Sequence, residues 1–124
     1  MIQIIFSFLI FTLLSPVAFA AGANETLFTI LRETGFAAVS VGSADVIAVE
    51  NVYCEEKSSG KAKCTASQDG TMSKISDSRL FLAALRGETP IVAKKIITFK
   101  SLECSSRINA DSSAFYSCTV TPLD

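Results

Sequence analysis

The chain has 124 residues, of which 49% are hydrophobic, and its 11 lysines and arginines nearly balance its 12 aspartates and glutamates, for a net charge of −1. That charge offers no electrostatic basis for binding nucleic acid or an anionic membrane. The sequence has no histidine, which excludes the Ser–His and Cys–His dyads of common hydrolases and the commonest zinc ligand. We expect no cofactor and no metal, because the sequence also lacks a glycine-rich nucleotide loop, a C-x-x-C motif and a calcium-type acidic loop.

Residues 1–20 have the features of a secretory signal peptide. The stretch carries no charged side chain, contains Pro16 near its end and closes on Ala18-Phe19-Ala20, which is the small-x-small pattern of a cleavage site. We predict cleavage at this point, which leaves one domain, residues 21–124, in the periplasm or the medium and without a membrane segment. An uncleaved anchor is the alternative, because roughly twenty apolar residues can span a bilayer.

The first half of residues 21–124 predicts a helix and then a hairpin. Apolar residues at helical spacing occupy 24–35, with Asn24 as N-cap and Gly35 as the stop. Asn24 also begins an N-glycosylation sequon. Asp69-Gly70 predicts a turn after the hairpin. The predicted strands are 36–41, 45–54 and 64–68, and a polar loop covers 55–63.

The second half repeats this order. Residues 77–86 form the predicted helix, with Ser76 as its cap and Gly87 as its stop, and its apolar stripe begins at Leu80 and Phe81. The remaining predicted segments are a strand over 91–104, strongest over 96–104, a polar loop over 105–113 and a strand over 114–121.

The four cysteines predict two local disulfides, Cys54–Cys64 and Cys104–Cys118. When the two cysteines of a hairpin face each other, the residues two positions away on the same face are also opposed. In both hairpins these residues are apolar, which favours local pairing over the two other connectivities. Two disulfides behind an export signal indicate an oxidising compartment. The opposed apolar pairs are Val52–Ala66 and Leu102–Val120.

These elements predict an α+β domain, with an antiparallel sheet of four to five strands and two short helices on one face. The two halves share the order helix, strand, strand, and Leu27-Phe28 corresponds to Leu80-Phe81. This likeness predicts an internal duplication of an αββ unit. The alternative is that any two disulfide-linked hairpins behind helices look this similar.

Three residues near the second disulfide are predicted to contact a partner. Arg107 and Ile108 lie in the predicted loop closed by Cys104–Cys118, where a basic residue could enter a trypsin-like pocket at a reduced entropic cost. The alternative is an ordinary polar hairpin in which Ile108 folds back onto the sheet. Alternation places Tyr116 on the face of Cys118, and tyrosine is enriched at interfaces, although it more often covers a sheet.

No catalytic residue is predicted. Ser58-x-x-Lys61 matches a nucleophile pattern but lies in a hydrophilic loop. Glu55 and Glu56 are neighbours whose side chains point apart, so they do not form a carboxylate pair for acid–base catalysis.

The sequence therefore predicts an exported, non-enzymatic module that binds another protein. In the strongest version of this hypothesis, the module inhibits the protein that it binds. An exported domain of this size with two hairpin disulfides and no catalytic set is similar in outline to small secreted bacterial inhibitor and binding proteins. One alternative is a structural or accessory component of the cell envelope. Another is a hydrolase that uses Asp, Glu, Ser and Lys alone.

Overall fold

A computed structural model describes residues 21–57, 61–88 and 96–123. The predicted signal peptide lies outside these ranges, as do residues 91–95 of the predicted strand 91–104. The helices of the described part are α2 (Ala21–Thr34) and α3 (Ser78–Glu88). Its strands are β1 (Val39–Val41), β2 (Ala44–Glu56), β3 (Ala62–Gln68), β4 (Thr71–Lys74), β5 (Ile96–Ile108) and β6 (Ala114–Pro122).

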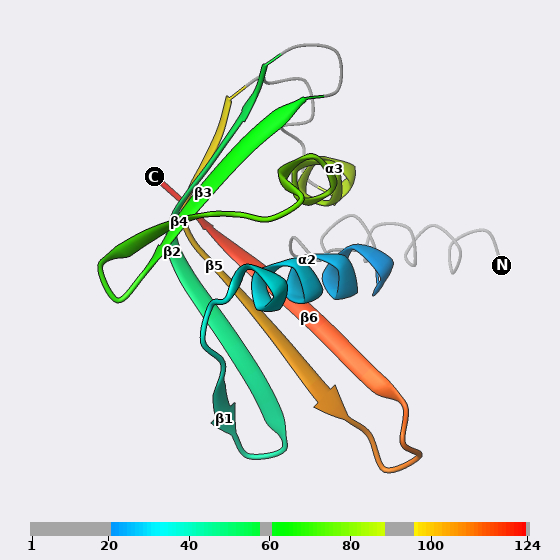
Figure 1. Cartoon of the computed structure of the whole chain (residues 1–124). Coiled ribbons are helices and arrows are strands. Elements are labelled where there is room, and N and C mark those ends of the chain that lie inside the picture. Colours follow the sequence, from blue (N-terminus) through cyan, green and yellow to red (C-terminus); the bar gives the residue numbers. More distant parts are fainter. Residues whose placement is uncertain (1–20, 58–60, 89–95, 124) are drawn as a thin grey trace, which may run out of the picture.

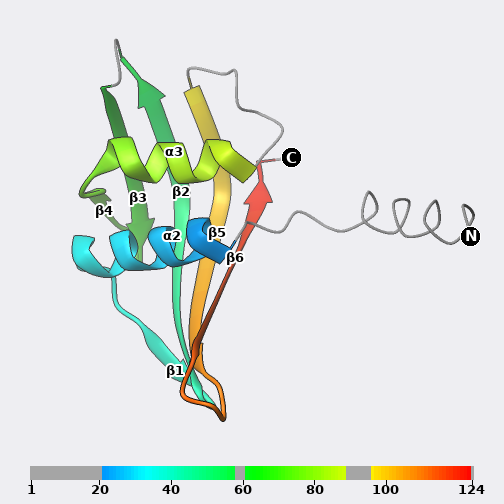
Figure 2. The same cartoon turned by 90° about the vertical axis from the view of Figure 1, so that its right-hand side faces the viewer.

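The six strands of the described ranges form one antiparallel sheet in the order β4-β3-β2-β5-β6, and β1 pairs with the start of β2. Figures 1 and 2 show both of the described helices on one face of this sheet, running across the strands. The predicted α+β class and the placement of the helices are confirmed. The predicted strand number is too low because β4 folds back on β3 after Asp69-Gly70, whose φ angles of 53° and 82° make a tight turn.

The end of α2 is the end that the sequence predicts. Gly35 has a φ of 106°, which a residue with a side chain rarely adopts. Its backbone N–H donates to the Arg32 carbonyl at 3.0 Å, and the N–H of Phe36 donates to the Leu31 carbonyl at 3.3 Å. These two hydrogen bonds form a Schellman motif, which satisfies the last carbonyls of the helix.

Both helix starts differ from the prediction. Asn24 is not an N-cap, because α2 already contains Ala21–Asn24. Asp77 rather than Ser76 caps α3, and its Oδ1 accepts a hydrogen bond from the Leu80 N–H at 3.4 Å. Gly87 does not stop α3, which continues through it. The buried stripe also differs from the prediction, because Leu80 is 48% exposed while Phe81, Leu82 and Leu85 are buried.

Both predicted disulfides are present. Cys54 lies opposite Cys64 and Cys104 opposite Cys118 in the strand register, and each pair is bonded. Leu102 lies opposite Val120, as predicted. All four cysteines are buried within the single apolar core between sheet and helices. The largest fully buried side chains around them are Phe81, Leu27, Leu31, Ile47, Ile75, Leu85, Ile97 and Leu102.

Irregularities in two strands bend the sheet. The β2–β3 register shifts between Glu50 and Tyr53, where Asn51 has a φ of 52°, and β5 is irregular against β6 near its middle. The predicted Val52–Ala66 pair is therefore not part of the register, although both side chains are buried. Bulges bend strands, and Figure 1 shows the sheet folding around the two helices. We call the opposite sheet face, which neither described helix covers, the open face.

The structure does not show a duplication. Each half has a helix followed by a disulfide-linked strand pair, but the first half has two additional strands, β1 and β4, and the halves are joined by pairing of β2 with β5.

Candidate partner-binding surface

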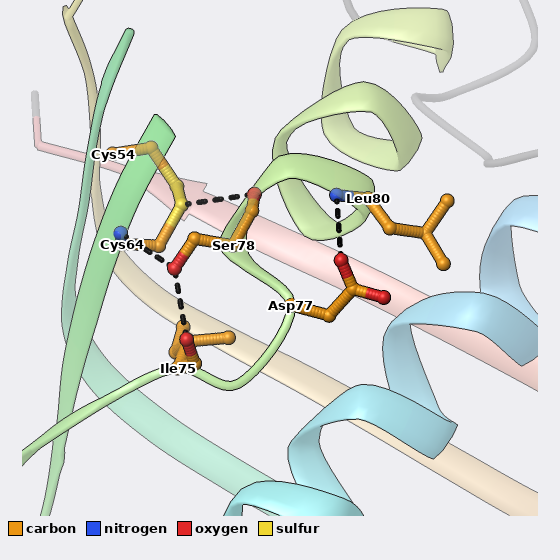
Figure 3. The surroundings of a disulfide bond; sticks show 6 residues. All are labelled: Cys54, Cys64, Ile75, Asp77, Ser78 and Leu80. Carbon is orange, nitrogen blue, oxygen red and sulfur yellow. Dashed lines mark hydrogen bonds between the residues drawn. A yellow bond between two sulfur atoms is a disulfide. The ribbon is translucent and has the colours of Figure 1, made fainter. Parts of the chain in front are cut away.

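Each disulfide lies beneath the first turns of a helix. For the first hairpin, Ser78 makes the junction (Figure 3): its Oγ accepts a hydrogen bond from the Cys64 N–H at 2.9 Å and donates one to the Ile75 carbonyl at 2.8 Å. The Cys64 Sγ, which carries no proton in the disulfide, contacts the Ser78 carbonyl oxygen at 3.7 Å. Ser78 is 6% exposed, so these bonds satisfy polar groups that water does not reach.

For the second hairpin, Asn24 makes the corresponding junction. The Asn24 Nδ2 donates a hydrogen bond to the Tyr116 backbone carbonyl at 3.2 Å. The backbone carbonyl oxygen of Asn24 lies 3.5 Å from the Cys118 Sγ. The Tyr116 ring packs against Phe28, with ring centroids 5.7 Å apart. Asn24 is 8% exposed, and a glycan would be attached to the Nδ2 atom that donates to Tyr116, so this hydrogen bond argues against use of the sequon.

The second hairpin continues past its helix. β5 extends to Ile108, and Arg107 pairs on one side with Ala44 of β2 and on the other with Phe115 of β6. The expectation that Arg107 and Ile108 lie in a loop is therefore wrong. The loop covers only 109–113. Residues 105–108 pair with residues 114–117 throughout, so the end of the hairpin is regular sheet.

Alternation along the strands places the three predicted contact residues on two faces. Cys104 points into the core, so Arg107, three residues on, points to the open face, and Ile108 points to the helix side. Tyr116 lies on the helix side with Cys118, as predicted, and is half-buried. The structure thus does not bring Arg107 together with Ile108 and Tyr116. Their roles in partner binding stay predictions.

The open face carries most of the exposed large apolar side chains. Of the eight such side chains in the described residues, five lie there by register and alternation, and a sixth, Leu123, lines a hollow with Tyr53 and Met72 of that face. Contact surfaces are typically contiguous exposed apolar patches, whereas single exposed apolar residues are ordinary. The six are Val39, Val41, Met72, Ile96, Phe115 and Leu123.

Three of these residues gather around Arg107 at the end of the sheet. Val41 pairs with Ala44, Ala44 with Arg107, and Arg107 with Phe115, so one row crosses β1, β2, β5 and β6. Val39, Val41 and Phe115 are 63%, 61% and 50% exposed. The Arg107 guanidinium lies 5.7 Å from the centre of the Phe115 ring, within the range of a cation–π contact. We call Val39, Val41, Arg107 and Phe115 the tip patch.

Two hollows lie on the open face. One, of about 230 Å³, adjoins the tip patch and is lined by Ala44, Ser105, Arg107, Phe115 and Ser117.

The other, of about 410 Å³, lies at the β2 bulge and includes Tyr53, Met72 and Leu123 in its lining. Tyr53 lies on the face opposite Cys54, as alternation predicts.

The sequence interpretation missed Val39, Val41 and Phe115. The signal was present for two of them, because Val39-Ser40-Val41 alternates as a half-buried strand does.

One charged pair joins the first hairpin to α3. Arg86 donates from its guanidinium to Glu56 Oε1 at 2.7 Å, joining α3 to β2. This hydrogen bond raises the pKa of the guanidinium, against a smaller opposing effect of burial. No group of three His, Cys, Asp or Glu residues in the described ranges could hold a metal ion. Ser58 lies outside those ranges.

Comparisons of the chain with protein-family models, curated proteins and solved structures found no match. Two disulfides are typical of proteins from an oxidising extracellular or periplasmic environment. Within residues 21–57, 61–88 and 96–123, neither helix has the length and hydropathy needed to cross a bilayer.

Proposed function

We propose that the protein is an exported, non-enzymatic module that binds another protein through the open face of its sheet, at the tip patch. The observation that carries this proposal is the row from Val41 to Phe115, in which an exposed arginine lies in line with exposed apolar side chains on a paired sheet. Arginine and aromatic residues are enriched among the residues that dominate binding energy. A surface already fixed by strand pairing loses little conformational entropy on binding.

The face of the sheet supports binding better than its edges do. At the β6 edge, the Tyr116 carbonyl already accepts a hydrogen bond from Asn24, and Pro122 has no N–H to offer. At the other edge, β4 has only four residues. Short strands, proline and covering helices all discourage addition of a strand from another protein.

The geometry favours a particular version of the inhibitor hypothesis. A substrate-like inhibitor offers an exposed backbone on both sides of its basic residue, whereas the Arg107 backbone lies between two paired strands. We therefore propose that any inhibition occurs because the open face covers a surface of the partner, and not because Arg107 occupies a protease pocket as a substrate would.

We also propose that the fold descends from a duplicated αββ unit. The support is the equivalent environment of the two disulfides. A sulfur of each lies close to a carbonyl oxygen in the first turns of a helix, Cys118 to Asn24 at 3.5 Å and Cys64 to Ser78 at 3.7 Å.

The test of function is affinity capture with matched baits. The oxidised protein, purified from an exporting host, would be offered the envelope and medium fractions of its source organism. The unaltered bait should retain one soluble protein stoichiometrically. Phe115→Thr should weaken that binding by about 10-fold or more, as loss of an aromatic anchor does. Leu80→Gln is the control, because Leu80 is equally exposed, at 48%, but lies on α3.

Other outcomes would replace the proposal. Equal loss with Phe115→Thr and Leu80→Gln would remove the tip patch from the contact. Recovery of membrane or wall material alone would indicate an envelope component. Turnover of an ester, glycan or peptide substrate, abolished by a single carboxylate substitution, would indicate a hydrolase.

A further inference from the structure

We infer that the hollow beside Arg107 binds a carboxylate of the partner, presented by an aspartate or glutamate that is flanked by apolar residues. This inference rests on the proposed function and specifies the chemistry of the partner. It is drawn from the charge of Arg107, the shape and lining of the hollow, and the apolar side chains at its rim.

The charge of Arg107 is unmatched on its own face. Among the described residues, no carboxylate lies within 4.0 Å of its guanidinium, whereas Arg86 and Arg32 lie 2.7 Å and 3.8 Å from Glu56 and Asp45. Asp45 is close in register to Arg107, but it pairs with Ser106 and points to the helix side. An exposed guanidinium without a carboxylate partner, at the centre of an apolar patch, attracts an anionic group from another molecule.

The hollow has the size and lining for one carboxylate side chain. Its volume is about 230 Å³, and its lining includes the small residues Ala44, Ser105 and Ser117, with Arg107 and Phe115 beside them. The guanidinium can donate two parallel hydrogen bonds to a carboxylate, and the Ser117 hydroxyl can donate another, whereas the Ser105 hydroxyl already donates to the Ser117 carbonyl at 3.5 Å. The Phe115 ring, 5.7 Å from the guanidinium carbon, limits the positions of the arginine and prepares it for binding.

The rim explains why the carboxylate should have apolar neighbours. Val39 lies opposite Val46, which pairs with Ser105, and Val41 lies in the row of Arg107. Partner side chains that cover these valines and Phe115 would exclude water from the ion pair. An ion pair shielded in this way is stronger than one in water, and dry surroundings are typical of residues that dominate binding.

The experiment is selection of a random dodecapeptide phage library on the immobilised, oxidised protein. Selected peptides should share an aspartate or glutamate next to a large apolar residue. For a synthetic peptide of that sequence, Arg107→Gln should weaken binding by about 10-fold or more, and Arg107→Lys should restore only part of it, because lysine lacks the planar fork. Arg79→Gln is the matched control, since it removes the same exposed side chain from α3.

A double-mutant cycle identifies the pair itself. Replacing the peptide carboxylate by the corresponding amide should cost about as much as Arg107→Gln, and the two changes together should cost no more than either alone. Amide chemical shifts should change around Ala44, Ser105 and Ser117 on titration with the peptide.

The inference is overturned if the selection yields no sequence with an acidic residue, or if Arg107→Gln and Arg79→Gln leave peptide affinity equally unchanged. This failure is distinguishable from failure of the proposed function. Peptides or a partner protein that still lose affinity with Phe115→Thr would keep the tip patch as the binding surface and remove only the carboxylate site.

Discussion

The two disulfide hairpins begin alike and end differently. In each, the cysteine pair is buried beneath the first turns of a helix. The first hairpin has only two strand residues beyond Cys54, whereas the second has four beyond Cys104 and is joined there by β1 (Figure 1). The covered part of a hairpin and the part that extends past its helix therefore have different roles. Beneath a helix, the side chains of the hairpin must pack into the core. Where the strands extend past the helix, their side chains are exposed and can contact another protein.

Removal of the disulfides should give the largest effects on stability. Replacing both cysteines of either pair by alanine should lower the free energy of unfolding by about 2–4 kcal/mol. The sequence separations of 10 and 14 imply a difference between the two of only about 0.3 kcal/mol from loop closure. Urea denaturation of the two variants measures both values.

Partner binding should separate these two variants although their stabilities do not. At a temperature where both are folded, loss of Cys104–Cys118 should weaken binding, because the tip patch extends from that hairpin. Loss of Cys54–Cys64 should leave affinity within about two-fold of the unaltered protein. Equal weakening by both would show that the open face acts as a whole and would remove the distinction between the hairpins.

The two helix junctions should differ by a smaller amount. Ser78→Ala leaves the buried Cys64 N–H and Ile75 carbonyl without their partner, which should cost about 1–3 kcal/mol. Asn24→Ala removes a longer bond, 3.2 Å, to a partly buried carbonyl and should cost about 1 kcal/mol. Thermal unfolding ranks the two.

The control for the junctions is Ser76→Ala, near Ser78, whose exposed hydroxyl shares a hydrogen bond with the Thr34 hydroxyl at 3.2 Å. Because water can replace that exposed bond, the substitution should change stability by less than about 0.5 kcal/mol. A larger loss with Asn24→Ala than with Ser78→Ala would place the main anchor of the helices at the second hairpin.

Sequence reasoning succeeds in this chain where a hairpin is regular. Disulfide pairing and the Leu102–Val120 register follow from alternation within one hairpin and are correct, whereas the Val52–Ala66 pair, predicted by the same rule, is interrupted by the β2 bulge. Asn24 is wrong as a cap because α2 already begins at Ala21, and its side chain instead donates to the Tyr116 carbonyl, 92 residues away in the chain. Interactions between distant segments leave no local pattern to read.

The candidate site shows the same division. The end of β5 could have been treated as strand in the sequence. Alternation counted from Cys104 then places Arg107 and Ile108 on opposite faces. The apolar surroundings of Arg107 could not have been predicted, because Val41 reaches its row only through pairing of β1 with β2 and of β2 with β5.

The smallest predicted effect concerns the loop that closes the second hairpin. Asp111 Oδ1 accepts hydrogen bonds from the Ser113 hydroxyl at 2.6 Å and the Ser113 N–H at 3.0 Å. The hydroxyl bond, followed by the backbone bond, lowers the pKa of the Asp111 carboxyl. Because the pKa is lower in the folded loop, the ordering contribution is present above the unfolded value of about 3.9 and is lost as pH falls through the folded value.

We therefore expect the Ser113 amide to show a chemical-shift transition and faster hydrogen exchange below about pH 4. The global unfolding temperature should be set by the rest of the protein and not by this loop. Asp111→Asn should abolish that transition, because its amide does not titrate in this range. Thr119 in the middle of β6 provides an internal control, since it pairs with Glu103 far from the loop. If Thr119 and Ser113 lost protection together, the loop would not open separately, and the end of the hairpin would be as rigid as the part beneath α2. Such rigidity would strengthen the case for the tip patch as a preformed surface and would show that helix cover is not what fixes the two hairpins.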